Sequence, residues 1–156
     1  MSATAPFVIT RSVGAPRARV WQAWTEVEHL QHWWGPKGFV VAHCTVDLRP
    51  GGLMHYRLRS PEGGDMWGRF VYREIVKPEK LVWVNSFSDE KGGVTRHPMA
   101  PGWPREMLTT VTFAEQGKGT LINYGALAGI IFGGPIVSTV LQNGGGILAG
   151  LAGLKF

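Results

Sequence analysis

The chain has 156 residues, a formal net charge of +5 and 44% apolar residues. This length suits one domain with a sizeable core, and we expect a single domain over 1–156 with a flexible segment 1–6. One cysteine excludes an internal disulfide and fits a reducing compartment. The basic residues are scattered rather than clustered, which argues against a nucleic-acid partner. The absence of a charged-then-apolar leader predicts a cytoplasmic location.

The first part of the chain predicts one strand and two short helices. Residues 7–13 alternate and are β-branched, as in a strand, and Pro16 then stands in the first turn of a helix. Thr25, with Glu28 three residues later, predicts a capping box that starts a second helix. The second helix ends at Gly35-Pro36. The two helices hold four of the seven tryptophans, at positions 21, 24, 33 and 34.

From residue 39 onward, short alternating segments and tight turns predict an antiparallel, meandering sheet. The expected strands cover residues 39–48, 53–59, 66–76, 81–87, 105–115 and 120–124. A longer loop, rich in proline and glycine, occupies residues 89–104. With the first strand, this makes about seven strands.

The tail from residue 121 onward has an unusual composition. It holds nine of the 22 glycines and a single charge, Lys155. The uncharged stretch 121–141 is long enough to span a bilayer, but Gly133-Gly134-Pro135 breaks it, so we do not expect a membrane span. We expect residues 121–135 to be atypical, with a loop that leads from the last strand to Pro135, and residues 136–154 to form a C-terminal helix.

Six motifs follow one another along the chain. They are Ala15-Pro16-Arg17 with Val20-Trp21-Gln22-Ala23-Trp24-Thr25, Glu28-His29-Leu30 with Trp33-Trp34-Gly35-Pro36, Asp47-Leu48-Arg49-Pro50-Gly51-Gly52, Gly68 with Tyr72-Arg73-Glu74-Ile75, Pro78-Glu79-Lys80-Leu81-Val82, and Met107-Leu108-Thr109-Thr110-Val111-Thr112-Phe113.

On these motifs, from about residue 7 to residue 120, the chain resembles the START-like (SRPBCC) superfamily. Within it the chain resembles the branch named after the activator of the heat-shock-protein-90 ATPase. The resemblance implies an α+β helix-grip fold: a curved antiparallel sheet, two short helices after the first strand, and a C-terminal helix packed on the sheet. The tail 121–156 departs from the family pattern, which continues with a charged strand and a charged helix.

The sequence predicts no metal site, cofactor or catalytic residue. His29 and His32 are spaced to share a metal on one helix, but no third ligand is placed, since His43 and Cys44 point to opposite faces of a strand. Cys44 has no recognisable base partner, so we interpret it as a small strand residue of the core.

Apolar and aromatic residues remain as the candidate site. In a helix-grip fold they line a cavity between the sheet and the C-terminal helix, with Asn85 as a polar contact. The predicted lining is Trp33, Trp34, Phe39, Met54, Tyr56, Phe70, Trp83, Asn85, Phe87 and Met107, with His97, Met99 and Trp103 as a loop gate. The alternative is that the same side chains fill the space as core.

Three functions stay open at this point. The first is non-catalytic binding of a hydrophobic small molecule, lipid-like or aromatic, in that cavity. The second is an enzyme of the polyketide cyclase or aromatase kind, in which one polar cavity residue moves protons. The third is a co-chaperone-like domain with a protein partner, which the name of the branch suggests. Fold alone does not decide among them.

Overall fold

The computed structural model describes residues 7–36, 38–96 and 105–128. Their elements follow in the order β1 (Phe7–Val13), α1 (Arg17–Thr25), α2 (Val27–Trp33), β2 (Val40–Val46), β3 (Leu53–Arg59), β4 (Asp65–Val76), β5 (Lys80–Ser88), β6 (Val94–Thr95), β7 (Met107–Gln116) and β8 (Gly119–Ala128).

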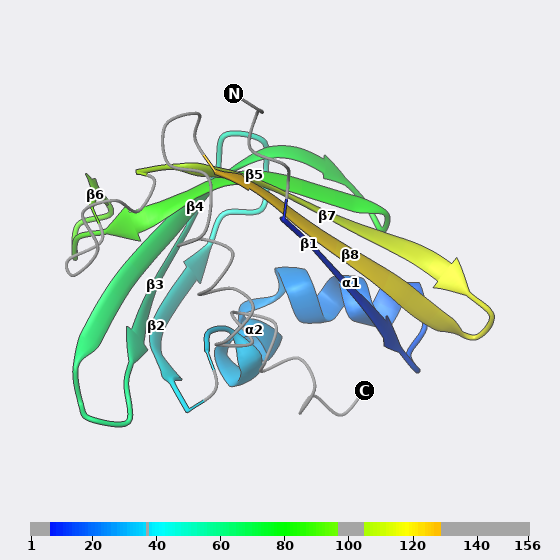
Figure 1. Ribbon diagram of the computed structural model, residues 1–156, viewed down its shortest axis with the longest axis horizontal. Coiled ribbons are helices and arrows are strands. Elements are labelled where there is room, and N and C mark those ends of the chain that lie inside the picture. Colours follow the sequence, from blue (N-terminus) through cyan, green and yellow to red (C-terminus); the bar gives the residue numbers. More distant parts are fainter. Residues whose placement is uncertain (1–6, 37, 97–104, 129–156) are drawn as a thin grey trace.

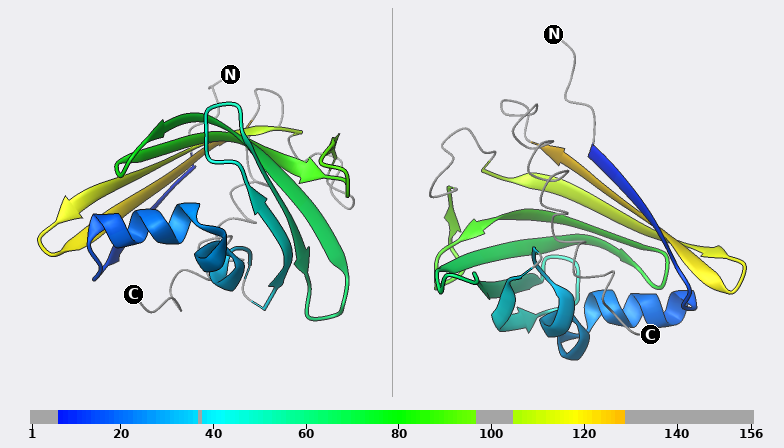
Figure 2. Two further views of the ribbon diagram at one scale, coloured as in Figure 1. Left: turned by 180° about the vertical axis from the view of Figure 1, so that it is seen from behind. Right: turned by 60° about the horizontal axis from the view of Figure 1, so that its bottom comes forward.

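All strands belong to one antiparallel sheet. Its order is β1-β8-β7-β5-β4-β3-β2, and the short β6 pairs with β5 beside this path. The sheet curves strongly, and both helices lie on its concave side (Figures 1 and 2). This confirms the predicted α+β class, the two helices after the first strand and the seven main strands. The strand β6 was not predicted, and the expected helix 136–154 lies outside the described residues.

The two helices present their tryptophans to the sheet. In α1 the buried residues include Val20, Trp21 and Trp24, and in α2 Leu30 and Trp33 are buried. The positions lie three or four apart, so they form one face of each helix. Besides its contacts with α2, α1 packs on β7 and β8, whereas α2 packs on β2. Helices and sheet therefore enclose the core between them.

The predicted capping box is wrong. Thr25 is the last residue of α1, and its hydroxyl donates to the carbonyl of Trp21 at 2.8 Å. Glu26, with an extended backbone, is the N-cap of α2, and its side chain makes no capping hydrogen bond. A threonine hydroxyl can bond the carbonyl four residues back in its own helix, and here that bond replaces the cap.

None of the helices in the described part of the chain has the length and apolarity needed to cross a lipid bilayer.

Candidate functional site

Strand register arranges the concave face in rows across β3, β4, β5 and β7. One row pairs Tyr72 with Trp83 and Trp83 with Thr109, and the next pairs Phe70 with Asn85 and Asn85 with Met107. Alternate residues of a strand share a face, so all of these side chains project toward the helices or beyond their end. Most of the predicted lining residues therefore share one surface.

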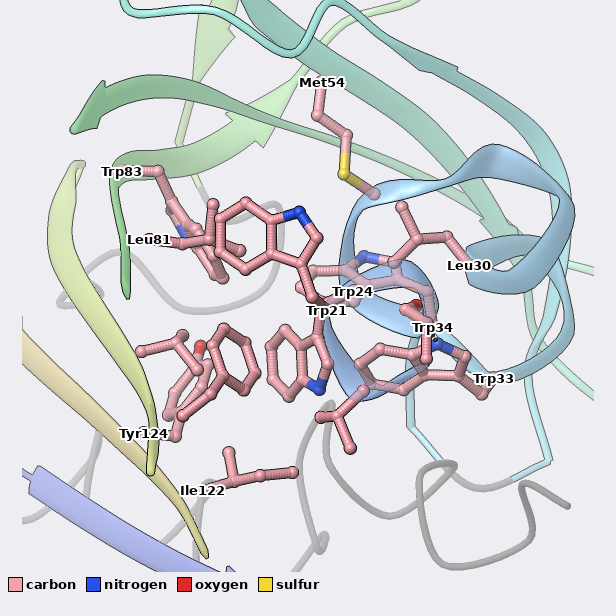
Figure 3. Packing of buried hydrophobic residues seen from close by; sticks show 14 of the residues in the cluster. Trp21, Trp24, Leu30, Trp33, Trp34, Met54, Leu81, Trp83, Ile122 and Tyr124 are labelled. Atoms are coloured by element: carbon pink, nitrogen blue, oxygen red, sulfur yellow. Dashed lines mark hydrogen bonds between the residues drawn. The ribbon is translucent and has the colours of Figure 1, made fainter. Parts of the chain in front are cut away.

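Part of this surface is packed core. Phe70 and Trp83 stack with ring centroids 4.4 Å apart, and Trp34 meets Phe70 and Tyr56 at 5.6 and 5.7 Å. Figure 3 shows the helix tryptophans meeting the residues of the sheet. Six predicted lining residues belong to this cluster, none more than 7% exposed: Trp33, Trp34, Met54, Tyr56, Phe70 and Trp83. The packing of these six residues matches the alternative interpretation, in which the side chains fill the core rather than line a cavity.

The other predicted residues lie at the rim of this core. Asn85 and Phe87 are half-buried, Met107 is buried, and Phe39 packs against the core while partly exposed. His97, Met99 and Trp103, the predicted loop gate, lie outside the described residues. The far end of β5 and the start of β7 thus form the candidate site next to the packed aromatics.

Glycine at position 68 shapes this end of the face. Gly68 pairs with Tyr56 on β3 and with Phe87 on β5. A Cβ at this position would overlap the ring of Tyr56, so the tyrosine lies across the strand where a side chain would otherwise stand.

Three polar side chains, those of Tyr124, Thr109 and Asn85, form a line across the apolar concave face. The Thr109 hydroxyl donates to Oδ1 of Asn85 at 2.7 Å, and Thr109 is fully buried. Burial raises the pKa of Tyr124 to about 12, an effect that a hydrogen bond with the Thr109 side chain partly offsets. Buried polar groups need partners, and these three residues provide them for one another. The line ends at Asn85, the half-buried member.

The ionisable groups of the core are held neutral. Burial raises the pKa of Cys44 to about 11 and raises the pKa of Tyr72 well above its usual range. It does the same to Tyr56, where the nearby Trp34 indole offsets part of the rise. In contrast to Tyr124, the Tyr72 hydroxyl has no hydrogen-bond partner among the described residues. At neutral pH these side chains offer hydrogen bonds but no charge.

The histidines of α2 and β2 are the candidate metal ligands in the sequence. His29 and His32 lie on α2, where the imidazole of His29 is 3.9 Å from a Glu26 carboxylate oxygen. His43 and Cys44 sit at successive positions of β2. Within the described ranges, no group of three or more His, Cys, Asp and Glu side chains is placed to hold a metal ion.

The convex face carries a cluster that sequence reasoning missed. His55 alternates with the concave residues of β3 and so lies on the convex face, yet it is only 8% exposed. Its ring stacks on Trp67 at 4.8 Å, and its Nε2 lies 3.0 Å from the carbonyl oxygen of Asp89. Arg69 donates to the carbonyl of Gly92 at 2.6 Å. Together they hold the turn after β5 against the sheet. The alternation of β3 places His55 on this face but gives no sign of the turn.

Comparison with known proteins identifies relatives. The family model described as "Activator of Hsp90 ATPase homolog 1-like protein" matches residues 14–129. No curated protein matches the chain.

Several solved structures are similar in fold. A protein of Arthrobacter aurescens is 21% identical with a TM-score of 0.77, over 94% of this chain and 81% of that one. A protein of Nitrosomonas europaea is 21% identical with a TM-score of 0.73, over 94% and 89%. The AHSA1 protein of Silicibacter pomeroyi is 16% identical with a TM-score of 0.70, over 95% and 93%. At these identities the likeness shows the fold.

Proposed function

Since the chain belongs to the family of activator of Hsp90 ATPase homolog 1-like proteins, a branch of the START-like superfamily, we propose that it binds a hydrophobic small molecule without transforming it. Membership in this family suits ligand binding or a co-chaperone-like role. The line from Tyr124 through Thr109 to Asn85 is the observation that favours the first.

The proposed ligand lies on the concave face at the end of β5, between Asn85, Phe87 and Met107. Two of these residues are apolar, and Asn85 is the polar side chain that the buried line positions. A ligand site usually combines an apolar wall with a few fixed polar groups, which orient the bound molecule. The ligand class is therefore a lipid-like or aromatic molecule with one hydrogen-bonding group.

The chemistry of the core supports binding over proton transfer. A general acid or base works best with a pKa near the working pH. Burial moves the pKa values of Cys44 and Tyr124 to about 11 and about 12 instead. An amide such as Asn85 orients a ligand but does not titrate. These residues suit recognition rather than acid–base catalysis.

The test is a titration with an apolar fluorescent probe, followed through tryptophan quenching. We expect Asn85→Leu and Phe87→Ala to weaken binding about tenfold, the equivalent of ~1.4 kcal/mol, because one removes the polar anchor and the other an apolar wall. The matched control is Ser86→Ala, since Ser86 is the next residue of β5 and lies on the opposite face.

Equal affinity for Asn85→Leu, Phe87→Ala and the unchanged protein would contradict this site. A probe that binds Ser86→Ala as weakly as Asn85→Leu would indicate a general loss of structure rather than a lost contact. Thermal unfolding of the three variants separates these two outcomes.

A further inference from the structure

The hydroxyl of Thr109 has a single hydrogen, and this decides the direction of the hydrogen bonds on the concave face. Thr109 donates that hydrogen to Oδ1 of Asn85 at 2.7 Å. The oxygen of an amide accepts hydrogen bonds and never donates them, so this bond runs from Thr109 to Asn85. The Thr109 oxygen remains an acceptor for other donors, because a hydroxyl oxygen has two lone pairs.

Tyr124 supplies the donor at the buried end of the line. Its side chain shares a hydrogen bond with Thr109. Since Thr109 gives its only hydrogen to Asn85, the hydrogen of this second bond comes from the Tyr124 hydroxyl. Tyr124 is 4% exposed, and burial raises its pKa to about 12, so the hydroxyl keeps its proton at neutral pH. All hydrogens of the line therefore point the same way, from Tyr124 toward Asn85.

The direction of the line fixes the orientation of the Asn85 amide. If the amide turned over, it would donate to Thr109, and Thr109 would donate to Tyr124. The Tyr124 hydroxyl would then lose Thr109 as the acceptor of its hydrogen, which is costly for a buried group. Oδ1 of Asn85 therefore faces Thr109, and the two N–H donors on Nδ2 face away from it.

The residues around Asn85 make its donors the polar feature of an apolar surface. The register sets Phe70 and Met107 beside Asn85 on the neighbouring strands. Trp83 and Phe87 are two positions away on β5 and lie on the same face. None of these four neighbours is ionisable. Asn85 itself is half-buried, so a molecule that lies on these residues can reach its N–H groups.

We propose that the ligand of the concave face presents a neutral hydrogen-bond acceptor, the carbonyl oxygen of a ketone, ester or amide, to Nδ2 of Asn85. This rests on the proposed function, because it specifies the molecule bound at the same site. A ligand group that only donates would meet the N–H donors of Asn85 with no acceptor. A carboxylate would lie on apolar residues with no cation among the four described neighbours, and burying an unpaired charge costs far more than burying a carbonyl.

Three flat molecules of nearly the same shape test the proposal. Fluorenone, carbazole and fluorene share one fused-ring skeleton, in which the bridging group is a carbonyl, an N–H and a methylene, respectively. Tryptophan quenching gives the dissociation constant of each molecule. We expect fluorenone to bind about tenfold more tightly than fluorene, and carbazole no more tightly than fluorene.

Substitutions on the line should change this preference in different ways. Asn85→Leu removes the donors, so the preference for fluorenone should disappear. Asn85→Asp replaces the donors with acceptor oxygens, so carbazole should bind more tightly than fluorenone. Thr109→Val removes the hydroxyl that fixes the amide, so the advantage of fluorenone over carbazole should shrink, whereas Thr109→Ser keeps the hydroxyl and the preference. Ser86→Ala, on the opposite face of β5, should leave the ratios unchanged.

The ratio of affinities is the readout, because a general loss of structure weakens the binding of all three molecules alike. Equal binding of the three by the unchanged protein would overturn the acceptor proposal and leave the proposed function standing. A preference of the unchanged protein for carbazole would overturn it as well. Failure of all three to bind would contradict the proposed function and the acceptor proposal together.

Discussion

The two faces of one curved sheet differ although the same strands build them. On β3 the concave residues Met54 and Leu58 are fully buried, while Arg57 and Arg59 point outward on alternate positions. On β7 the concave residue Val111 is fully buried and the convex Leu108 is 43% exposed. The concave face therefore carries the stability of the fold, and the convex face is free to carry contacts with other molecules.

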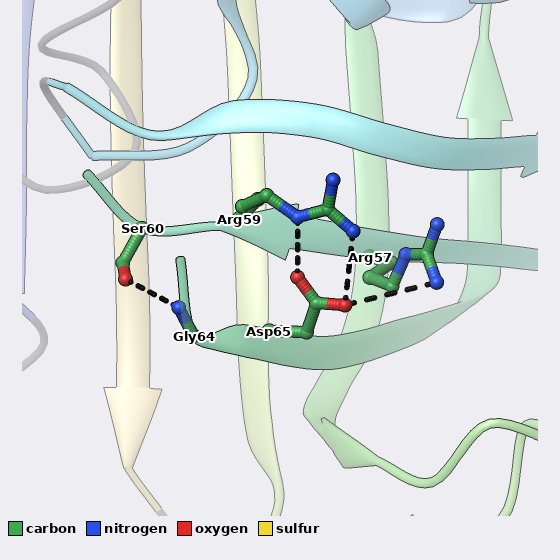
Figure 4. Close-up of polar contacts among 5 residues, drawn as sticks. All are labelled: Arg57, Arg59, Ser60, Gly64 and Asp65. Carbon is green, nitrogen blue, oxygen red and sulfur yellow. Dashed lines mark hydrogen bonds and ion pairs between the residues drawn. The ribbon is translucent and has the colours of Figure 1, made fainter. Parts of the chain in front are cut away.

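Each face of the sheet also differs from one end to the other. The concave face divides into an aromatic core and a half-buried end at Asn85, and on the convex face Arg57 and Arg59 gather beside Asp65 on β3 and β4 (Figure 4). Strand alternation produces the difference between the two faces. The position of each residue along its strand, relative to the two helices, produces the differences within a face.

The largest expected effect on the free energy of unfolding comes from comparing a tryptophan on the concave side of the sheet with one on the convex side. Trp24 is 2% exposed, and Trp67, on the convex face, is partly exposed. We expect Trp24→Ala to lower the free energy of unfolding by about 3–5 kcal/mol, since it empties the centre of the core. Trp67→Ala removes a stack on His55 and a contact with Arg57 and should cost about 1 kcal/mol. Urea denaturation measures both, and equal losses would contradict the division.

Alkaline pH should weaken the concave face selectively. Burial raises the pKa of Cys44 from 9.0 to about 11 and that of Tyr124 from 10.0 to about 12, so folding favours their neutral forms. Their contribution is complete below about pH 9 and is lost as the pH rises toward 12. The free energy of unfolding, measured against pH, should fall in that window.

The cysteine sets where this fall begins. In Cys44→Ala the loss should begin one pH unit higher, near the ordinary value of 10.0 for a tyrosine. The same pH dependence with and without Cys44 would contradict a folded-state pKa of its thiol above the unfolded value.

The smallest effect separates two buried tyrosines. Within the described ranges the Tyr72 hydroxyl has no hydrogen-bond partner, whereas Tyr124 has a hydrogen bond with Thr109. Tyr72→Phe should therefore raise the free energy of unfolding by about 1 kcal/mol, and Tyr124→Phe should lower it by about 1 kcal/mol. Changes of the same sign in both variants, in matched thermal and urea unfolding, would refute the assignment of the polar line.

The sequence predicted the elements better than their contacts. The strand Leu53–Arg59 was predicted to the residue, because its alternation is strict and glycines precede it. The predicted capping box was wrong because the Thr25 hydroxyl bonds to the carbonyl of Trp21 instead. Both bonds join residues three or four apart, so the spacing of the sequence does not distinguish them. The strand Val94–Thr95 was missed because two residues carry no periodicity.

The candidate site was predictable only as a face. Alternation placed Trp83, Asn85 and Phe87 on one side of β5, as the register confirms. It did not show that the helices would bury Trp83 and leave Asn85 half-buried, since this depends on where α1 and α2 end above the sheet. The bond between Thr109 and Asn85 joins residues 24 apart and follows from the pairing of β5 with β7.

Native mass spectrometry of freshly purified protein tests the proposed function most directly. We expect the unchanged chain and Ser86→Ala to carry a co-purified small molecule, which denaturing conditions release, and Asn85→Leu to carry much less of it. A chain that is always free of small molecules, and that binds no apolar probe, would contradict the assignment of a ligand to the concave face.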